Sequence, residues 1–184
     1  MVASPLLVQK YGGTSVGDTT RLTRCAARAV DAHRRGHEVV LVVSAMGRRT
    51  DELLGLARDV NREPPRDHLD LLLATGEQAS AALMAMAIEA MGVPAVPLAG
   101  PRLGIITEGV HGNARIRSID VNRVHEGLRR GAIVVCAGFQ GVSADGAVTT
   151  LGRGGSDTTA VAIAAALGVG GAAGSGACEI LTDV

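Results

Sequence analysis

Aromatic residues are almost absent from this sequence. Among its 184 residues there are one tyrosine, one phenylalanine and no tryptophan, although hydrophobic residues make up 47% of the chain. The core must therefore consist mainly of Ala, Val, Leu and Ile, which suits helices packed closely on a sheet. The scarcity argues against nucleic-acid readers that stack bases on aromatic side chains.

An excess of charge of either sign is also missing. Eighteen basic and 18 acidic residues give a net charge of zero, so nothing resembles the basic surface of a protein that binds nucleic acid or an anionic membrane. Lysine itself is rare, because 17 of the basic residues are arginines and only Lys10 is a lysine. Lys10 is therefore a position to follow as a candidate functional residue.

Paired cysteines, metal-ligand spacings and long apolar runs are lacking too. Cys25, Cys136 and Cys178 lie far apart without a C-x-x-C pair, and we expect buried, reduced thiols. The five histidines show no metal-ligand spacing, so no metal site is expected. No apolar run reaches roughly 18 residues and no basic leader precedes the first strand, which predicts a cytoplasmic protein without a membrane partner.

What the sequence does contain is an alternation of strand and helix patterns. Strands are predicted at 6–9, 39–43, 95–98, 133–137 and 178–182, and helices at 20–35, 51–60, 67–91, 120–131 and 156–167. The helix at 67–91 is expected to be interrupted at 75–77, Asp120 to cap the next helix, and Ser156 or Asp157 to cap the last. This order predicts one α/β domain over 1–184 around a largely parallel sheet.

The first candidate site is the glycine-rich turn at 10–15 (KYGGTS), between a strand and a helix. Adjacent glycines let backbone N–H groups approach a ligand, and a helix N-terminus favours anions. Lys10 adds a compact positive charge suited to phosphate. An ordinary tight turn with a solvated lysine is the alternative.

A second glycine-rich turn at 152–159 (GRGGSDTT) also leads into a helix. Arg153 can bind a carboxylate through two hydrogen bonds, and Ser156 and Thr158 offer hydroxyl groups. Asp157 either caps the helix or faces Lys10 and holds its ammonium group. Neither turn is a P-loop, because G-x-x-x-x-G-K-[ST] occurs nowhere in the sequence.

Glu77 is a third candidate, in an apolar neighbourhood that we place near the start of a helix. Its carboxylate either complements the helix dipole or pairs with the ammonium group of an amino-acid ligand. The residues around it leave both interpretations open.

Six segments together resemble the aspartate kinases of the amino acid kinase family. They are 8–16 (VQKYGGTSV), 42–47 (VVSAMG), 74–78 (ATGEQ), 104–116 (GIITEGVHGNARI), 137–142 (AGFQGV) and 149–160 (TTLGRGGSDTTA). They occur in the family's order and span nearly the whole chain. The resemblance implies a layered α/β/α amino acid kinase fold. It also implies phosphorylation of the β-carboxylate of L-aspartate by ATP with Mg²⁺, giving 4-phospho-L-aspartate for lysine, threonine and methionine synthesis.

The resemblance also implies roles for individual residues. Lys10 and Asp157 would be catalytic, with Lys10 neutralising the transferred phosphoryl group and Asp157 orienting Lys10. Ser15, Thr50, Glu77, Arg153 and Ser156 would bind the substrate, Glu77 through its ammonium group and Arg153 through its α-carboxylate. Gly12, Gly13, Thr14, Gly154 and Gly155 would bind phosphate with Lys10. Thr182 and Asp183 would be the remnant of a nucleotide site.

Departures from the family pattern concern the C-terminal side. The family continues past T-D-V into a lobe that binds the nucleotide and then into ACT domains, whereas this sequence ends at Val184. We therefore expect a C-terminally truncated domain with an exposed sheet edge, covered by a second copy or a partner protein. The alternatives to an active kinase are a non-catalytic or partner-dependent amino-acid-binding subunit and a kinase for another carboxylate.

Overall fold

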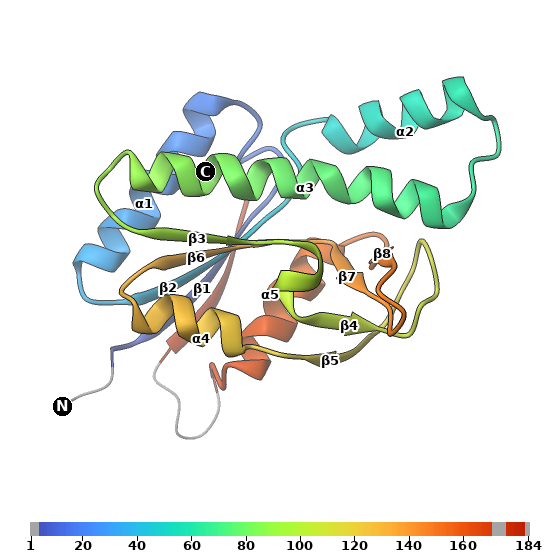
Figure 1. Cartoon of the computed structure of the whole chain (residues 1–184). Helices are drawn as coiled ribbons and strands as arrows, with labels where there is room; N and C mark the ends of the chain where they lie inside the picture. Colours follow the sequence, from blue (N-terminus) through green and yellow to red (C-terminus); the bar gives the residue numbers. More distant parts are fainter. Residues whose placement is uncertain (1–3, 171–175, 183–184) are drawn as a thin grey trace.

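A five-stranded, fully parallel sheet forms the centre of the protein (Figure 1). The computed structural model describes residues 4–170 and 176–182. The strand order is β3-β6-β2-β1-β9, and the strands are β1 (Leu6–Tyr11), β2 (Glu38–Val43), β3 (Ala95–Leu98), β6 (Ile133–Ala137) and β9 (Gly176–Leu181). The predicted α/β fold with a largely parallel sheet is confirmed.

Helices cover both faces of this sheet, which explains why β2 and β6 are almost wholly apolar. One face packs against α1 (Thr19–Arg34) and α3 (Arg66–Glu89), the other against α4 (Asn122–Arg129) and α5 (Gly155–Ala166). Helix α2 (Arg49–Val60) lies against α3 beyond the sheet (Figure 1). The three layers are built from aliphatic side chains, as the composition indicates.

A smaller second sheet has no counterpart in the strands expected from the sequence. Its order is β5-β4-β7-β8, with β4 (Ile105–Thr107), β5 (Ile116–Ile119), β7 (Gln140–Val142) and β8 (Val148–Thr150), preceded by a 3₁₀ turn at Gly100–Leu103. Three of these strands have only three residues, too few for a visible alternation of polar and apolar residues. Strand β8 packs against α3, and this contact joins the smaller sheet to the layers around the central sheet.

Helix α3 corrects one prediction, because it runs through 75–77 without interruption. A Cβ atom at Gly76 would lie 2.9 Å from the Cβ of Ala45, so the glycine permits close packing within the helix rather than a break. By length and composition α3 could cross a membrane, with a mean hydropathy of 1.4. In the fold, however, 44% of that apolar window is buried against the rest of the protein.

The predicted helix caps are also wrong. Helix α4 begins after Val121, and the Asp120 carboxylate accepts a hydrogen bond from the Asn122 amide without capping the helix. Helix α5 begins after Gly154, whose φ of 70° is in the left-handed region that favours glycine. Ser156 and Asp157 therefore lie inside its first turn, where neither side chain is the N-cap.

Strand β9 is an edge strand that pairs with β1 on one side. Within the described residues its other side carries no strand, and Ile180 is among the exposed large hydrophobic side chains. Cys178 on β9 is exposed, contrary to the expectation of three buried thiols, whereas Cys25 and Cys136 are buried. Burial raises the pKa of the Cys136 thiol to about 12.

Candidate functional site

A cavity of about 580 Å³ opens beside the carboxyl ends of β1 and β2. In parallel α/β sheets this is the edge at which ligands bind. Its wall combines the turns after β1 and β2, the middle of α3 and the turn that enters α5. Of the residues singled out from the sequence, those that line it are Lys10, Gly13, Thr50, Glu77, Arg153, Gly154, Gly155, Ser156 and Asp157.

Lys10 and Asp157 form an ion pair across this cavity, with the ammonium nitrogen 2.7 Å from Oδ1 of the carboxylate. Lys10 lies near the end of β1, and its side chain is only 10% exposed. Asp157 comes from the first turn of α5 and keeps a half-exposed side chain. Of the two interpretations of Asp157, the structure places it against Lys10.

The turn after β1 is fixed by its neighbours rather than open to solvent. Gly13 accepts a hydrogen bond from the Gly47 amide at 2.9 Å, and a Cβ atom at Gly13 would lie 2.9 Å from the Ala45 carbonyl oxygen. Glycine is therefore required there for the close approach of two loops. The Gly12 amide donates to the carbonyl of Leu181 at 3.4 Å, which ties the same turn to β9.

Other residues assigned to this turn lie away from the cavity wall. Gly12, Thr14 and Ser15 are not among the described residues that line the cavity, and Ser15 is fully buried. Their roles toward phosphate or substrate stay predictions. Thr182 is exposed after the last strand, and Asp183 lies outside the described residues.

Glu77 presents a buried carboxylate in the middle of α3, not at a helix start, so the helix-dipole interpretation is wrong. The residue is 4% exposed, and its Oε1 accepts a hydrogen bond from the Ala45 amide at 3.0 Å. Its Oε2 has no hydrogen-bond partner among the described residues. Burial raises the pKa of Glu77 to about 7, partly opposed by the backbone hydrogen bond from Ala45. The unpartnered oxygen therefore suits a cationic ligand group.

The turn before α5 supplies the opposite charge. Gly152 and Gly154 adopt φ values of 77° and 70°, which hold Arg153 between two left-handed glycines. Arg153 is exposed and forms no ion pair with any residue in the described part of the chain. Its guanidinium group is thus available for a carboxylate ligand.

The cavity residues that were not singled out from the sequence include Asp70, Phe139 and Thr150. Phe139 has a φ of 69°, a strained value for a residue other than glycine, and its carbonyl accepts the Leu151 amide at 2.8 Å. Asp70 is 1% exposed on α3 and bonds to Thr150. An isolated carboxylate between leucines was the available signal for Asp70.

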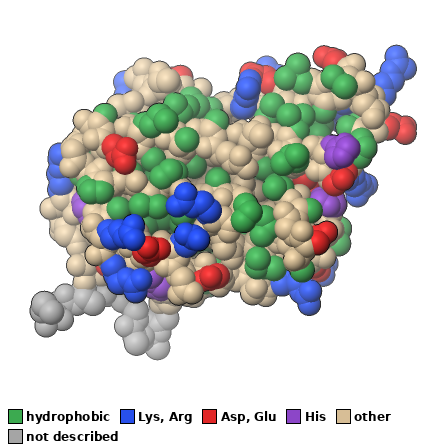
Figure 2. All heavy atoms as spheres, viewed as in Figure 1, with side chains coloured by type: hydrophobic (Ala, Val, Ile, Leu, Met, Phe, Trp, Pro, Cys, Tyr) green, Lys and Arg blue, Asp and Glu red, His purple; other side chains and the backbone are tan. Residues whose placement is uncertain are grey.

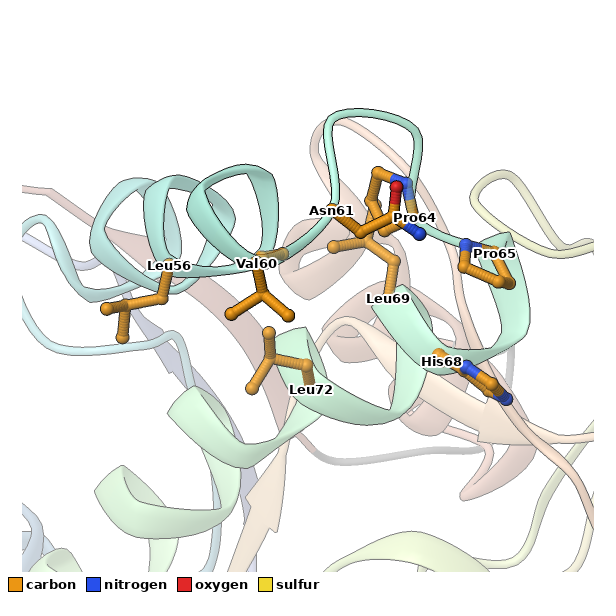
Figure 3. Close-up of a pocket in the computed structure, with 9 residues that line it drawn as sticks. Leu56, Val60, Asn61, Pro64, Pro65, His68, Leu69 and Leu72 are labelled. Carbon is orange, nitrogen blue, oxygen red and sulfur yellow. The ribbon is translucent and has the colours of Figure 1, made fainter.

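The surface also has a second cavity and charged side chains of both signs. An apolar cavity of about 410 Å³ lies between α2 and α3, lined by side chains such as Leu56, Val60 and Leu72 (Figure 3). On the face shown in Figure 2, Lys and Arg side chains lie beside Asp and Glu. No group of three or more His, Cys, Asp or Glu residues suited to a metal ion occurs in the described parts of the chain.

Comparisons with known proteins place the chain in a family. The model of the amino acid kinase family matches residues 5–184. The chain is 52% identical over 179 residues to the aspartokinase of Geobacillus stearothermophilus and 54% identical over 180 residues to that of Mycolicibacterium smegmatis. Both alignments include 97% of this chain but only 42% and 41% of the length of the two relatives.

Solved structures show the same fold. Aspartate kinase from Synechocystis superposes with a TM-score of 0.82 at 45% identity, covering 97% of this chain and 28% of that one. Aspartokinase III of E. coli, solved with aspartate and ADP, has a TM-score of 0.78 at 24% identity, covers 97% of this chain and 49% of that one, and supports the fold alone. The family model covers nearly the whole chain and the fold is the same: the chain belongs to the amino acid kinase family.

Proposed function

We propose that this chain forms the amino-acid-binding part of an aspartate kinase, which transfers the γ-phosphoryl group of ATP to the β-carboxylate of L-aspartate. One observation carries the proposal: a single cavity holds the Lys10–Asp157 ion pair together with a Glu77 oxygen and an Arg153 guanidinium that have no partner among the described residues. These groups match the three charged groups of L-aspartate. Aspartokinases at 50–54% identity support this substrate.

The head group of the amino acid would bind between α3 and the turn before α5. The ammonium group of L-aspartate supplies the partner that Glu77 Oε2 lacks, and Arg153 binds the α-carboxylate through two hydrogen bonds. Thr50 and Ser156 line the same wall and offer hydroxyl groups. The β-carboxylate then points toward Lys10, where the phosphoryl group is received.

Groups that suit the phosphates of ATP lie next to Lys10. Helix α5 starts without a side-chain cap, and Gly154 and Gly155 at its start line the cavity together with Gly13, with the Gly155 amide donating to the Gly152 carbonyl. Bound ATP with Mg²⁺ supplies the activated phosphoryl group, and Lys10, Gly13, Gly154 and Gly155 would hold its phosphates.

Charge compensation and positioning are the main requirements of the reaction. The β-carboxylate is ionised at neutral pH, so no strong general base is needed. One of its oxygens forms the new bond to the γ-phosphorus while the bond to the bridging oxygen breaks and ADP leaves. Lys10 offsets the negative charge that gathers between donor and acceptor, and Asp157 holds its ammonium group in place.

A second candidate is a non-catalytic or partner-dependent amino-acid-binding subunit. The chain spans about two fifths of the length of its aspartokinase relatives. The exposed edge at β9 offers a place for a second copy or a partner chain. A cytoplasmic location and a part in lysine, threonine and methionine synthesis belong to the kinase proposal.

Calorimetry of the 184-residue chain with L-aspartate, Mg-ATP and both together, followed by a coupled ADP-release assay, tests these candidates. The kinase proposal expects L-aspartate binding, Mg-ATP binding and ADP release that depends on L-aspartate. Aspartate binding without ATP binding or ADP release would favour the binding subunit. If the folded chain does not bind L-aspartate, both candidates are refuted. The Asp120→Asn variant, changed at an exposed residue outside the cavity, is the control and should behave as the wild type.

A further inference from the structure

Asp70 is a buried carboxylate that lines the cavity yet is occupied by the protein itself. Its Oδ2 accepts hydrogen bonds from the Gly112 amide at 2.9 Å and the Thr150 amide at 3.1 Å, and it lies 2.9 Å from Nδ1 of His111. Its Oδ1 accepts the Thr150 hydroxyl at 2.6 Å. Because a carboxylate is only an acceptor, the facing His111 nitrogen must be the donor. Both oxygens are thus engaged, which leaves Asp70 poorly placed to bind a ligand.

These bonds connect α3 to two other segments. His111 and Gly112 belong to the loop at 108–115, which joins β4 to β5, and Thr150 ends β8. The loop is also tied to β8 directly, since the Ala114 amide donates to the Thr150 carbonyl at 2.8 Å. Asp70 therefore clamps the loop and the strand end to the same point on α3.

The clamped loop sets the position of the turn that carries Arg153. A Cβ atom at Gly152 would lie 2.7 Å from Oδ1 of Asn113 and 3.4 Å from the Gly112 carbonyl oxygen, so the loop presses on the turn. On the turn's far side, the Gly155 amide donates to the Gly152 carbonyl at 3.0 Å. A shift of the loop would therefore move Arg153.

Glu77 lies on the same helix as Asp70, seven residues further along. They lie two helical turns apart, about 10 Å along the helix axis, and positions i and i+7 share a face of an α-helix. The residue that would hold the substrate's ammonium group and the residue that positions Arg153 are therefore built on one rigid element. The distance between the Glu77–Arg153 pair and Lys10 then decides how long an acidic side chain can be.

We propose that Asp70 is a positioning residue that fixes Arg153 relative to Glu77 and Lys10, and thereby makes the cavity select a four-carbon over a five-carbon acidic amino acid. This inference rests on the proposed function, because it takes the ligand to be an amino acid held by Glu77 and Arg153. A loosened turn would admit the extra methylene group of L-glutamate. Substitution of Asp70 should therefore lower discrimination and not merely affinity.

The test compares L-aspartate and L-glutamate binding by calorimetry in the wild-type chain and in Asp70→Asn and Thr150→Val variants. Asparagine keeps the shape but removes the charge, and valine removes only the hydroxyl donor to Asp70. Hydrogen exchange of the 108–115 peptide reports directly on the clamp. Asp120→Asn is the matched control, since the exposed Asp120 accepts one local hydrogen bond from Asn122. Thr150→Ser retains the hydroxyl and should restore the wild-type behaviour.

Both variants should exchange faster at 108–115, bind L-aspartate about tenfold more weakly and discriminate at least about threefold less against L-glutamate. Faster exchange with unchanged discrimination would reduce Asp70 to a structural role and overturn the inference. Unchanged exchange would show that Asp70 does not hold the loop, with the same consequence. A wild-type chain that binds neither acid would instead refute the proposed function, and this inference with it.

Discussion

Replacing Glu77 by glutamine should remove a pH dependence from the stability of this protein. In the unfolded chain a glutamate has a pKa of 4.5, whereas burial raises the pKa of Glu77 to about 7 in the fold. Between these values the folded state binds the extra proton, so stability falls as pH rises from 4.5 to 7. The difference corresponds to about 2–3 kcal/mol of unfolding free energy between pH 5 and pH 8.

Glutamine preserves the acceptor for the Ala45 amide but cannot ionise. Its amide nitrogen takes the place of the unpartnered Oε2, and the cost of that buried group does not change with pH. The quantity to compare is therefore the change of unfolding free energy with pH. It is measured by urea denaturation of wild type and Glu77→Gln at pH 5, 6, 7 and 8. The wild type should lose about 2–3 kcal/mol more than the variant over this range. Parallel curves would refute the argument that Glu77 is forced to ionise in a buried site.

The same ionisation should control ligand binding. L-aspartate bound through its ammonium group favours the charged form of Glu77, so its dissociation constant should fall by roughly 50- to 100-fold from pH 5 to pH 8. Glu77→Gln should bind L-aspartate weakly and without this pH dependence. A wild-type dissociation constant that does not change between pH 5 and pH 8 would contradict the proposed contact between Glu77 and the ammonium group.

Three further substitutions test the site and its supports. Lys10→Arg should abolish L-aspartate-dependent ADP release without lowering the melting temperature by more than a few degrees, because a guanidinium is longer and planar; retained activity would remove Lys10 from its role. Arg153→Ala should weaken L-aspartate binding by about 2 kcal/mol in calorimetry, whereas the exposed Arg117→Ala should not; equal effects would contradict a specific contact. Gly76→Ala should destabilise the fold by about 1–3 kcal/mol, because its Cβ would meet Ala45, while Gly55→Ala, with nothing within 4 Å, should stabilise it by about 0.5–1 kcal/mol in urea denaturation.

The sequence predicts those parts of the fold that are encoded in continuous apolar runs. Strand β6 occupies the predicted residues 133–137, a run of five apolar residues that are all buried in the central sheet. The short strands β4, β7 and β8 went unpredicted because three residues show no period. The sequence predicts a helix break at 75–77, whereas α3 is continuous and Gly76 is required by the close approach of Ala45, which is distant in the sequence.

For the site, sequence reasoning finds residues that stand in glycine-rich turns and misses those defined by remote partners. Lys10, Arg153 and Asp157 were found because a turn between a strand and a helix implies an anion site. Asp70 was missed because its partners lie 41 to 80 residues away in the chain. The leucines on either side make Asp70 stand out in the sequence, but only the fold shows which groups it contacts.

Strand β9 links the proposed phosphate corner to the open edge of the sheet. It pairs with β1 in a register that sets Ile180 opposite Lys10, and its Leu181 carbonyl accepts the Gly12 amide at 3.4 Å. Lys10 is thus held from one side by Asp157 and from the other through the backbone of β9. Whatever pairs with the free side of β9, whether a second copy, a partner or further polypeptide, would stiffen the strand that supports Lys10. Affinity for the phosphate donor should therefore respond to occupancy of this edge more strongly than affinity for L-aspartate, whose proposed ligands Glu77 and Arg153 lie on α3 and on the turn before α5.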